Sequence, residues 1–173
     1  MKPDLPSVVV LDVAFSGYGI IRSLHGFGIP IIGFCMAERS PESYTALCSE
    51  KIFFSDPSTL LDKLLAVSQD LPVKPVLFLT TDYYVEFFMR HKQALESAFL
   101  INTPDAPTLE LLLDKNKMAV FAAENDILIP HSFRIDGADG LQQVLDHARF
   151  PVILKPYKRT EAWEASGFNK AYI

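Results

Sequence analysis

The chain has 173 residues, of which 49% are hydrophobic and 21% charged, so it can bury a core and is not a disordered segment. A formal net charge of −5, with no cluster of lysine and arginine, argues against a nucleic acid partner, whose phosphates are normally met by a concentrated basic face. No apolar run approaches the roughly 20 residues that span a bilayer, and no secretory signal pattern opens the chain, so we expect a cytoplasmic protein that does not contact membranes.

Apolar runs of the length of buried strands alternate with helical patterns in the amino-terminal part of the chain. The predicted strands are residues 8–12, 29–34, 51–54, 76–79 and 99–101. The predicted helices are residues 17–24, 57–69 and 83–97. Ser55 or Asp56 could cap the second helix. Strands that alternate with helices and are apolar throughout indicate a parallel sheet covered on both faces. We therefore predict an α/β fold, with a Rossmann-like open parallel sheet over residues 1–104.

The two cysteines, Cys35 and Cys48, are too few for a disulfide framework. Neither has a second cysteine or a histidine at the spacing of zinc ligands, and the four histidines are scattered over different elements. The sequence therefore predicts two free thiols, buried or half-buried, and no metal site.

The pattern changes after residue 104. Two helical stretches lie at residues 108–113 and 115–124, and we interpret residues 105–127 as a helical connector. The elements predicted beyond it are a strand, a helix, a strand and the start of one more strand, at residues 129–135, 140–147, 150–156 and 168–173. We expect residues 128–173 to be the beginning of a second domain.

Three motifs resemble those of one enzyme family, and the first two also have its spacing. The first is LLDKNK at residues 112–117, followed by a helix and by ILIPHS at residues 127–132. The second is the strand FPVILKP at residues 150–156, and the third is the glycine-bearing turn DVAFSGYG at residues 12–19. Together they resemble the ATP-grasp superfamily, and within it the carboxylate–amine ligases.

The resemblance implies a fold and a reaction. Residues 1–104 would form the pre-ATP-grasp domain, and residues 128–173 an incomplete small subdomain of the ATP-grasp domain. The full-length enzyme would activate a small-molecule carboxylate as an acyl phosphate and pass it to an amine or a thiol, with ATP and Mg²⁺ as cofactors.

The resemblance also assigns the ATP phosphates to three lysines, because their negative charge has to be neutralised during transfer. Lys155 and Lys115 match the family motifs, and Lys170 is the third candidate. From the residues alone, Lys155 could instead be a strand-end lysine that reaches solvent, and Lys115 an ordinary residue of a helix surface. If the alignment of this segment to the family motif is shifted, Lys117 takes the place of Lys115.

Two loops at strand ends are candidates for substrate binding. Ser16 and Gly17 begin the first helix, whose backbone N–H groups would favour a carboxylate, although the glycine could simply allow a tight turn. Thr81 and Asp82 follow the strongest strand, at the edge where ligands of open α/β domains gather, and could instead cap the next helix.

Two departures from the family pattern bear on activity. The family usually has a glycine-rich loop after its strand lysine, whereas residues 157–167 contain a single glycine. The adenine-clamping strand, the carboxylates that hold magnesium and the neighbouring asparagine of the family have no counterpart before Ile173. We therefore expect no catalytic residues and no metal ligands in this chain, and no ligase turnover by this chain alone.

Other interpretations remain open at this point. One is a non-catalytic Rossmann-like module that binds a nucleotide or a small metabolite. A dinucleotide-dependent oxidoreductase is disfavoured, because Gly17 and Gly19 are not followed by the third glycine of the G-x-G-x-x-G pattern. The sequence names neither the carboxylate nor the amine, and it leaves the oligomeric state open, a homodimer included.

Overall fold

A computed structural model describes residues 5–36, 40–154 and 171–172 of the chain. The chain divides into two compact units, Met1–Leu109 and Glu110–Ile173, and each is described by itself. The division falls inside the segment predicted as the helical connector. The domain boundaries at residues 104 and 127 remain predictions.

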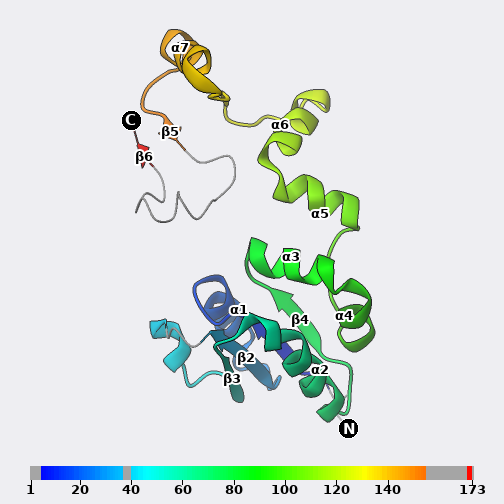
Figure 1. Cartoon of the computed structure of the whole chain (residues 1–173). Coiled ribbons are helices and arrows are strands. Elements are labelled where there is room, and N and C mark those ends of the chain that lie inside the picture. Colours follow the sequence, from blue (N-terminus) through cyan, green and yellow to red (C-terminus); the bar gives the residue numbers. More distant parts are fainter. Residues whose placement is uncertain (1–4, 37–39, 155–170, 173) are drawn as a thin grey trace. The chain divides into compact units, whose positions relative to one another are not determined.

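The first unit is built on one parallel sheet (Figure 1). Its strands are β1 (Val8–Leu11), β2 (Ile31–Met36), β3 (Glu50–Phe54) and β4 (Val76–Leu79), in the order β3-β2-β1-β4. All three neighbouring pairs are parallel. The predicted Rossmann-like open parallel sheet is therefore confirmed. The expected strand at residues 99–101 is reduced to a single parallel bridge between Val76 and Leu100.

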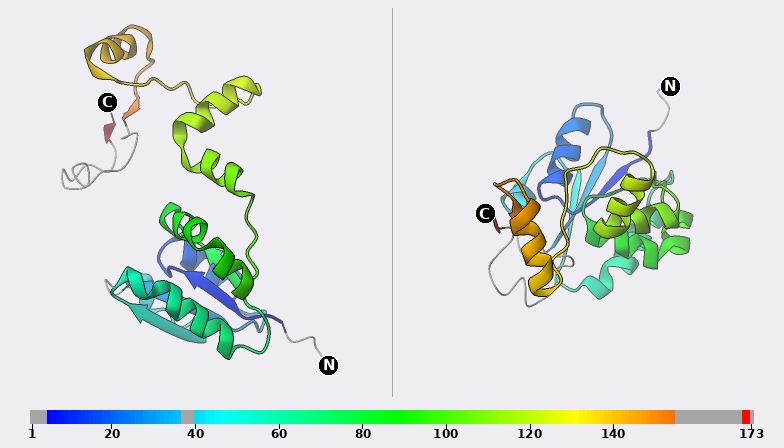
Figure 2. Two further views of the ribbon diagram at one scale, coloured as in Figure 1. Left: turned by 45° about the vertical axis from the view of Figure 1, so that its right-hand side comes forward. Right: turned by 90° about the horizontal axis from the view of Figure 1, so that it is seen from above.

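Helices cover both faces of this sheet (Figure 2). Helix α1 (Ser16–Leu24) places Ile21 in a core with alternate residues of β1 and β2. On the other face, α2 (Leu60–Asp70), α3 (Asp82–Arg90) and α4 (Lys92–Ala98) contribute to a larger core. Its fully buried members include Phe34, Leu60, Leu64, Phe88 and Leu95. Because successive side chains of a strand point to opposite faces, strands that are apolar throughout supply both cores.

The helix predicted at residues 83–97 is two helices instead of one. The chain leaves helical geometry at His91, with φ −116° and ψ 22°, and His91 N–H donates to the carbonyls of Phe87 and Phe88 at 3.2 and 3.1 Å. This bifurcated bond ends α3 and lets α4 start in a new direction. The helix predicted at residues 57–69 is observed as the short helix η2 (Pro57–Thr59) followed by α2. Asp56, not Ser55, caps η2 by accepting from Ser58 N–H at 2.9 Å.

The second unit begins within α5 (Ala106–Leu113) and continues with α6 (Lys115–Glu124) and α7 (Gly137–His147). A two-stranded antiparallel sheet joins β5 (Ile153–Leu154) to β6 (Ala171–Tyr172). The strand predicted at residues 129–135 was wrong, because this segment forms no ladder with any described strand and Pro130 has no N–H to donate. The strand predicted at 150–156 is observed only at Ile153–Leu154, and its end lies outside the described residues.

No helix in the described part of the chain combines the length and the apolar character needed to cross a bilayer.

Candidate functional site

The order of the strands creates a switch point between β1 and β4. From β1 the chain moves first to β2 and β3 on one side of the sheet, and then returns to β4 on the other side. At such a point the connections leave the carboxyl ends of the two strands in opposite directions, and the crevice between them is where open α/β sheets bind ligands. The loops after β1 and β4 carry all four residues predicted to bind substrate.

Position 17 requires glycine, because α1 starts very close to the end of β1. A Cβ at Gly17 would lie 1.7 Å from the carbonyl oxygen of Asp12, and Gly17 N–H donates to the carbonyl of Ala14 at 2.9 Å. The turn also requires positive φ values, 40° at Asp12 and 33° at Phe15, which residues other than glycine rarely adopt. The glycine therefore has a packing role that holds whether or not it also binds a ligand.

The first turn of α1 has no side-chain cap. Phe15 precedes the helix and makes no side-chain capping bond, and no acidic residue lies in the first turn. Ser16 is exposed. The partial positive charge of this helix end is therefore not neutralised by a capping side chain or by an acidic residue of the first turn.

The loop after β4 provides the other two predicted residues. Thr81 occupies the N-cap position of α3, but its side chain makes no capping hydrogen bond. Its carbonyl oxygen accepts from Tyr84 N–H at 3.0 Å and Val85 N–H at 3.1 Å, so the backbone alone closes the turn. The side chains of Thr81 and Asp82 are exposed. Capping by the Thr81 side chain, the alternative to substrate binding, is thus not observed.

Pairing of β1 with β4 brings the two loops together. Leu11 and Leu79, the last residues of the two strands, are partners in the parallel register. The hydroxyl of Thr80 donates to the carbonyl of Leu11, which ties the second loop to the end of β1. Ser16 and Gly17 thus lie on one side of the switch point, and Thr81 and Asp82 on the other.

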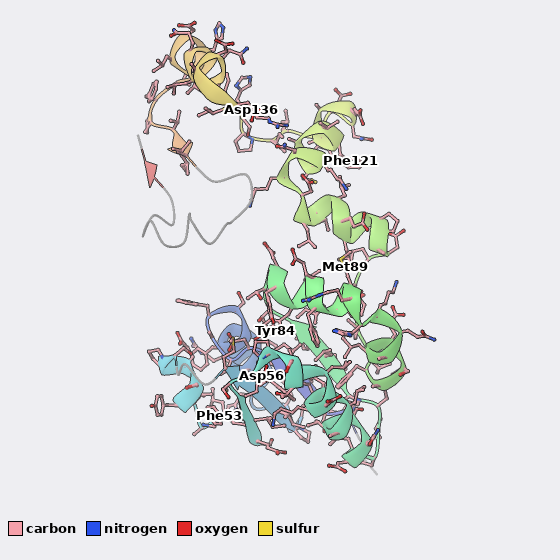
Figure 3. The ribbon with its side chains drawn as sticks, viewed as in Figure 1. Phe53, Asp56, Tyr84, Met89, Phe121 and Asp136 are labelled. Atoms are coloured by element: carbon pink, nitrogen blue, oxygen red, sulfur yellow. The ribbon has the colours of Figure 1, made fainter. Side chains whose placement is uncertain are left out.

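Two further residues of this site were not predicted to take part. Asp12 directly follows β1, and Tyr84 lies in the first turn of α3 with a side chain that is 2% exposed (Figure 3). Burial raises the pKa of the Tyr84 phenol, and the nearby carboxylate of Asp12 raises it further. Asp12 could have been predicted from its place at the end of a buried strand. Tyr84 could not, because an aromatic residue on a helix usually indicates only that the helix packs on the core.

Cys35 lies at the end of the same sheet, on the face covered by α1. Burial raises the pKa of its thiol to about 11, with smaller contributions in the same direction from Asp12 and Cys48. Burial also raises the pKa of Cys48, against the opposing effect of Lys51. The predicted free thiols are confirmed, with Cys35 buried and Cys48 half-buried.

The raised pKa of Cys35 predicts a loss of stability in alkali. The Cys35 thiol releases its proton near its ordinary pKa of 9.0 in the unfolded chain and near a pKa of about 11 in the folded chain. The contribution of this thiol to the free energy of unfolding is therefore fully present below pH 9 and is lost as the pH rises to 11. We expect urea unfolding to show a steeper fall in the free energy of unfolding between these pH values for the native sequence than for Cys35→Ala. Equal slopes would contradict this assignment.

The three predicted phosphate-binding lysines belong to the second unit. Lys115 is the first residue of α6 and is exposed. Asp114 caps this helix by accepting from the N–H groups of Asn116 and Lys117 at 2.9 and 3.1 Å, which fixes Lys115 at the helix start. Lys155 and Lys170 lie outside the described residues. In the sequence they directly follow Leu154 and precede Ala171, which are paired between β5 and β6.

No group of three or more histidine, cysteine, aspartate or glutamate side chains is arranged to hold a metal ion among the residues that the structure describes. A shallow hollow of about 260 Å³ lies beside α1, lined by Tyr18 and by Pro41, Glu42 and Thr45 in and after the short helix η1 (Pro41–Tyr44). A larger hollow, of about 500 Å³, lies between α2 and α4 and contains none of the predicted site residues.

Comparison with known proteins identifies the class of fold. No protein-family model matches the sequence, and no curated protein sequence does. The structure is similar to the crystal structure of N5-carboxyaminoimidazole ribonucleotide synthetase from Thermotoga maritima, with a TM-score of 0.57 and 18% identity over 97% of this chain and 45% of that chain. It is also similar to the biotin carboxylase domain of a single-chain bacterial carboxylase, with a TM-score of 0.51 and 21% identity over 82% of this chain and 33% of that one.

Both of these proteins are ATP-grasp enzymes, and the similarity covers their amino-terminal regions. The four-stranded parallel sheet and its helices match the amino-terminal domains of such enzymes. The chain spans less than half the length of either solved structure. The expected fold is thereby confirmed, and the predicted roles of individual residues remain predictions.

Proposed function

We propose that this chain forms the amino-terminal domain and the beginning of the ATP-binding domain of an ATP-dependent ligase. The enzyme would join a carboxylate to an amine, or to a thiol, through an acyl phosphate. The observation that carries this proposal is the similarity of fold to a synthetase over 97% of this chain and to a carboxylase over 82% of it. This similarity includes the β3-β2-β1-β4 parallel sheet of the first unit.

In this proposal the two units have separate tasks. The loops at the switch point of the first unit bind a substrate. Lys115, Lys155 and Lys170 of the second unit contact the phosphates of ATP, where positive charge offsets the charge that develops during transfer. Mg²⁺ would help to offset the charge of the phosphates, and the described residues contain no group of three or more histidine, cysteine, aspartate or glutamate side chains that could hold it.

The position of Lys115 allows a matched test of nucleotide binding. We expect the chain to bind MgATP weakly, and Lys115→Ala to weaken this binding about two- to fivefold, the effect of losing an exposed ion pair. Lys117→Ala is the comparison, because it removes the same charge from an exposed position two residues further along the same helix. A larger effect of Lys117→Ala than of Lys115→Ala would assign the phosphate contact to the shifted register. Isothermal titration calorimetry with MgATP measures both. The absence of MgATP binding, or equal effects of the two substitutions, would count against the assignment.

A further inference from the structure

Asp114 is the residue at which α5 ends and α6 begins. Its backbone N–H donates to the carbonyl of Glu110 in the last turn of α5 at 3.2 Å, and its own carbonyl accepts from Met118 N–H in the first turn of α6 at 2.9 Å. Between these two bonds its backbone is extended, with φ −98° and ψ 107°. This one residue therefore sets where α6 begins, and with it the position of Lys115.

The side chain of Asp114 closes the start of α6. Its carboxylate accepts from the N–H groups of Asn116 at 2.9 Å and Lys117 at 3.1 Å. These are two of the N–H groups that an α-helix leaves without a partner at its amino end, and a carboxylate there offsets part of the positive end of the helix dipole. A phosphate at this point would therefore be bound by the side chain of Lys115 rather than by these backbone N–H groups.

Packing does little to hold this end of α6. Among the ten residues of α6, all of which the structure describes, only Ala122 in the last turn is buried. A helix of this length is marginal in water by itself, and loss of its N-cap side chain favours fraying of the first turn about fivefold. The turn that carries Lys115 therefore depends on the Asp114 cap.

We propose that Asp114 is a positioning residue for nucleotide binding, because by capping α6 it holds Lys115 where its ammonium group meets a phosphate of ATP. This role rests on the proposed function, since it needs Lys115 to contact ATP. Asp114 acts through Lys115, so losing the cap weakens binding by no more than losing Lys115 itself. The negative charge of Asp114 acts in the opposite direction, because a carboxylate repels the phosphates.

Two neutral variants separate the cap from the charge. Asp114→Asn and Asp114→Ala remove the same negative charge, but only asparagine still caps the helix. We expect Asp114→Ala to bind MgATP about two- to fivefold more weakly than Asp114→Asn in calorimetric titrations of the whole chain. In the Lys115→Ala background the two variants should bind MgATP equally, because the cap then has no lysine to position. Backbone NMR of the free chain should show helical shifts at residues 115–118 that Asp114→Asn keeps and Asp114→Ala reduces.

Asp105 offers a matched control at the start of α5. Its side chain accepts from Thr108 N–H at 3.1 Å, so Asp105→Asn and Asp105→Ala change a cap and a charge in the same way, further from Lys115 along the sequence. This second pair should bind MgATP equally.

Three results would overturn the positioning role while MgATP binding by the native chain still supports the ligase proposal. They are equal affinities of the two Asp114 variants, a difference between them that persists without Lys115, and an intact first turn of α6 in Asp114→Ala. If the native chain does not bind MgATP, the ligase proposal fails and the positioning role fails with it.

Discussion

Replacing Gly17 with alanine should destabilise the first unit by about 3 kcal/mol or more. The added methyl group would lie 1.7 Å from the carbonyl oxygen of Asp12, 2.9 Å from its carbonyl carbon and 3.1 Å from Cγ1 of Val10. Two of these atoms belong to the backbone of a turn that begins at the end of the central strand β1, so they cannot rotate away. Relief would require α1 to move away from the sheet, which opens the core around Ile21.

Gly19 provides a control in the same helix. A Cβ there would have no heavy atom within 4 Å, so Gly19→Ala should be neutral or stabilise the unit by up to about 1 kcal/mol through its higher helix propensity. Urea unfolding followed by circular dichroism compares the two variants. Equal stabilities for Gly17→Ala and Gly19→Ala would show that α1 does not approach β1 as described.

The second large effect concerns nucleotide affinity. We expect Lys155→Ala to weaken MgATP binding about 10- to 100-fold, because a lysine that contacts phosphate directly contributes roughly 1.5–3 kcal/mol. This loss should exceed that of Lys115→Ala, since Lys115 is exposed at a helix start. Calorimetric titration of both variants under the same conditions measures the difference.

Lys158→Ala is the matched control for Lys155→Ala. It removes the same charge three residues further along the sequence, at a position that matches no motif of the family. Its affinity for MgATP should equal that of the native sequence. If both substitutions weaken binding equally, Lys155 contributes only to the general charge of the segment, and its assignment to the ATP phosphates is wrong.

The fold of the first unit could be predicted from the sequence because its local signals are strong and agree with one another. The run from Val8 to Leu11 is apolar throughout, as a strand buried on both faces requires. Gly26 and Gly28, with φ values of 98° and 73°, follow the end of α1, where glycine is typical. Asp56 caps the segment leading into α2.

Predictions of secondary structure failed where tertiary contacts override the local sequence pattern. Residues 129–135 have the composition of a strand, but a strand forms only beside a partner, and no described segment pairs with it. The break at His91 depends on a bifurcated hydrogen bond to Phe87 and Phe88 that no spacing reveals. Leu154 pairs with Ala171, which lies seventeen residues further along the chain, a separation that local reasoning does not bridge.

The sequence could predict that the loops after β1 and β4 lie at the same edge of the sheet, but not which side chains act on one another there. The carboxyl ends of the strands indicated the loops at Gly17 and at Thr81, and pairing of Leu11 with Leu79 brings these loops together. The electrostatic effect of Asp12 on Tyr84 and Cys35 could not be predicted from the sequence, because these residues lie far apart along the chain. The effect of the Asp12 carboxylate on the pKa of Tyr84 arises only because β1 pairs with β4.

The most direct test of the ligase proposal is which nucleotide the chain binds, and at which residues. Backbone amide NMR can follow the whole chain during separate titrations with MgATP and with NAD⁺. The proposal predicts saturable shifts with MgATP at the start of α6 and in the β5–β6 pair, and no shifts with NAD⁺ in the loop of residues 12–17. Saturable binding of NAD⁺ at that loop, without a response to MgATP in the second unit, would contradict it and favour a dinucleotide-binding protein.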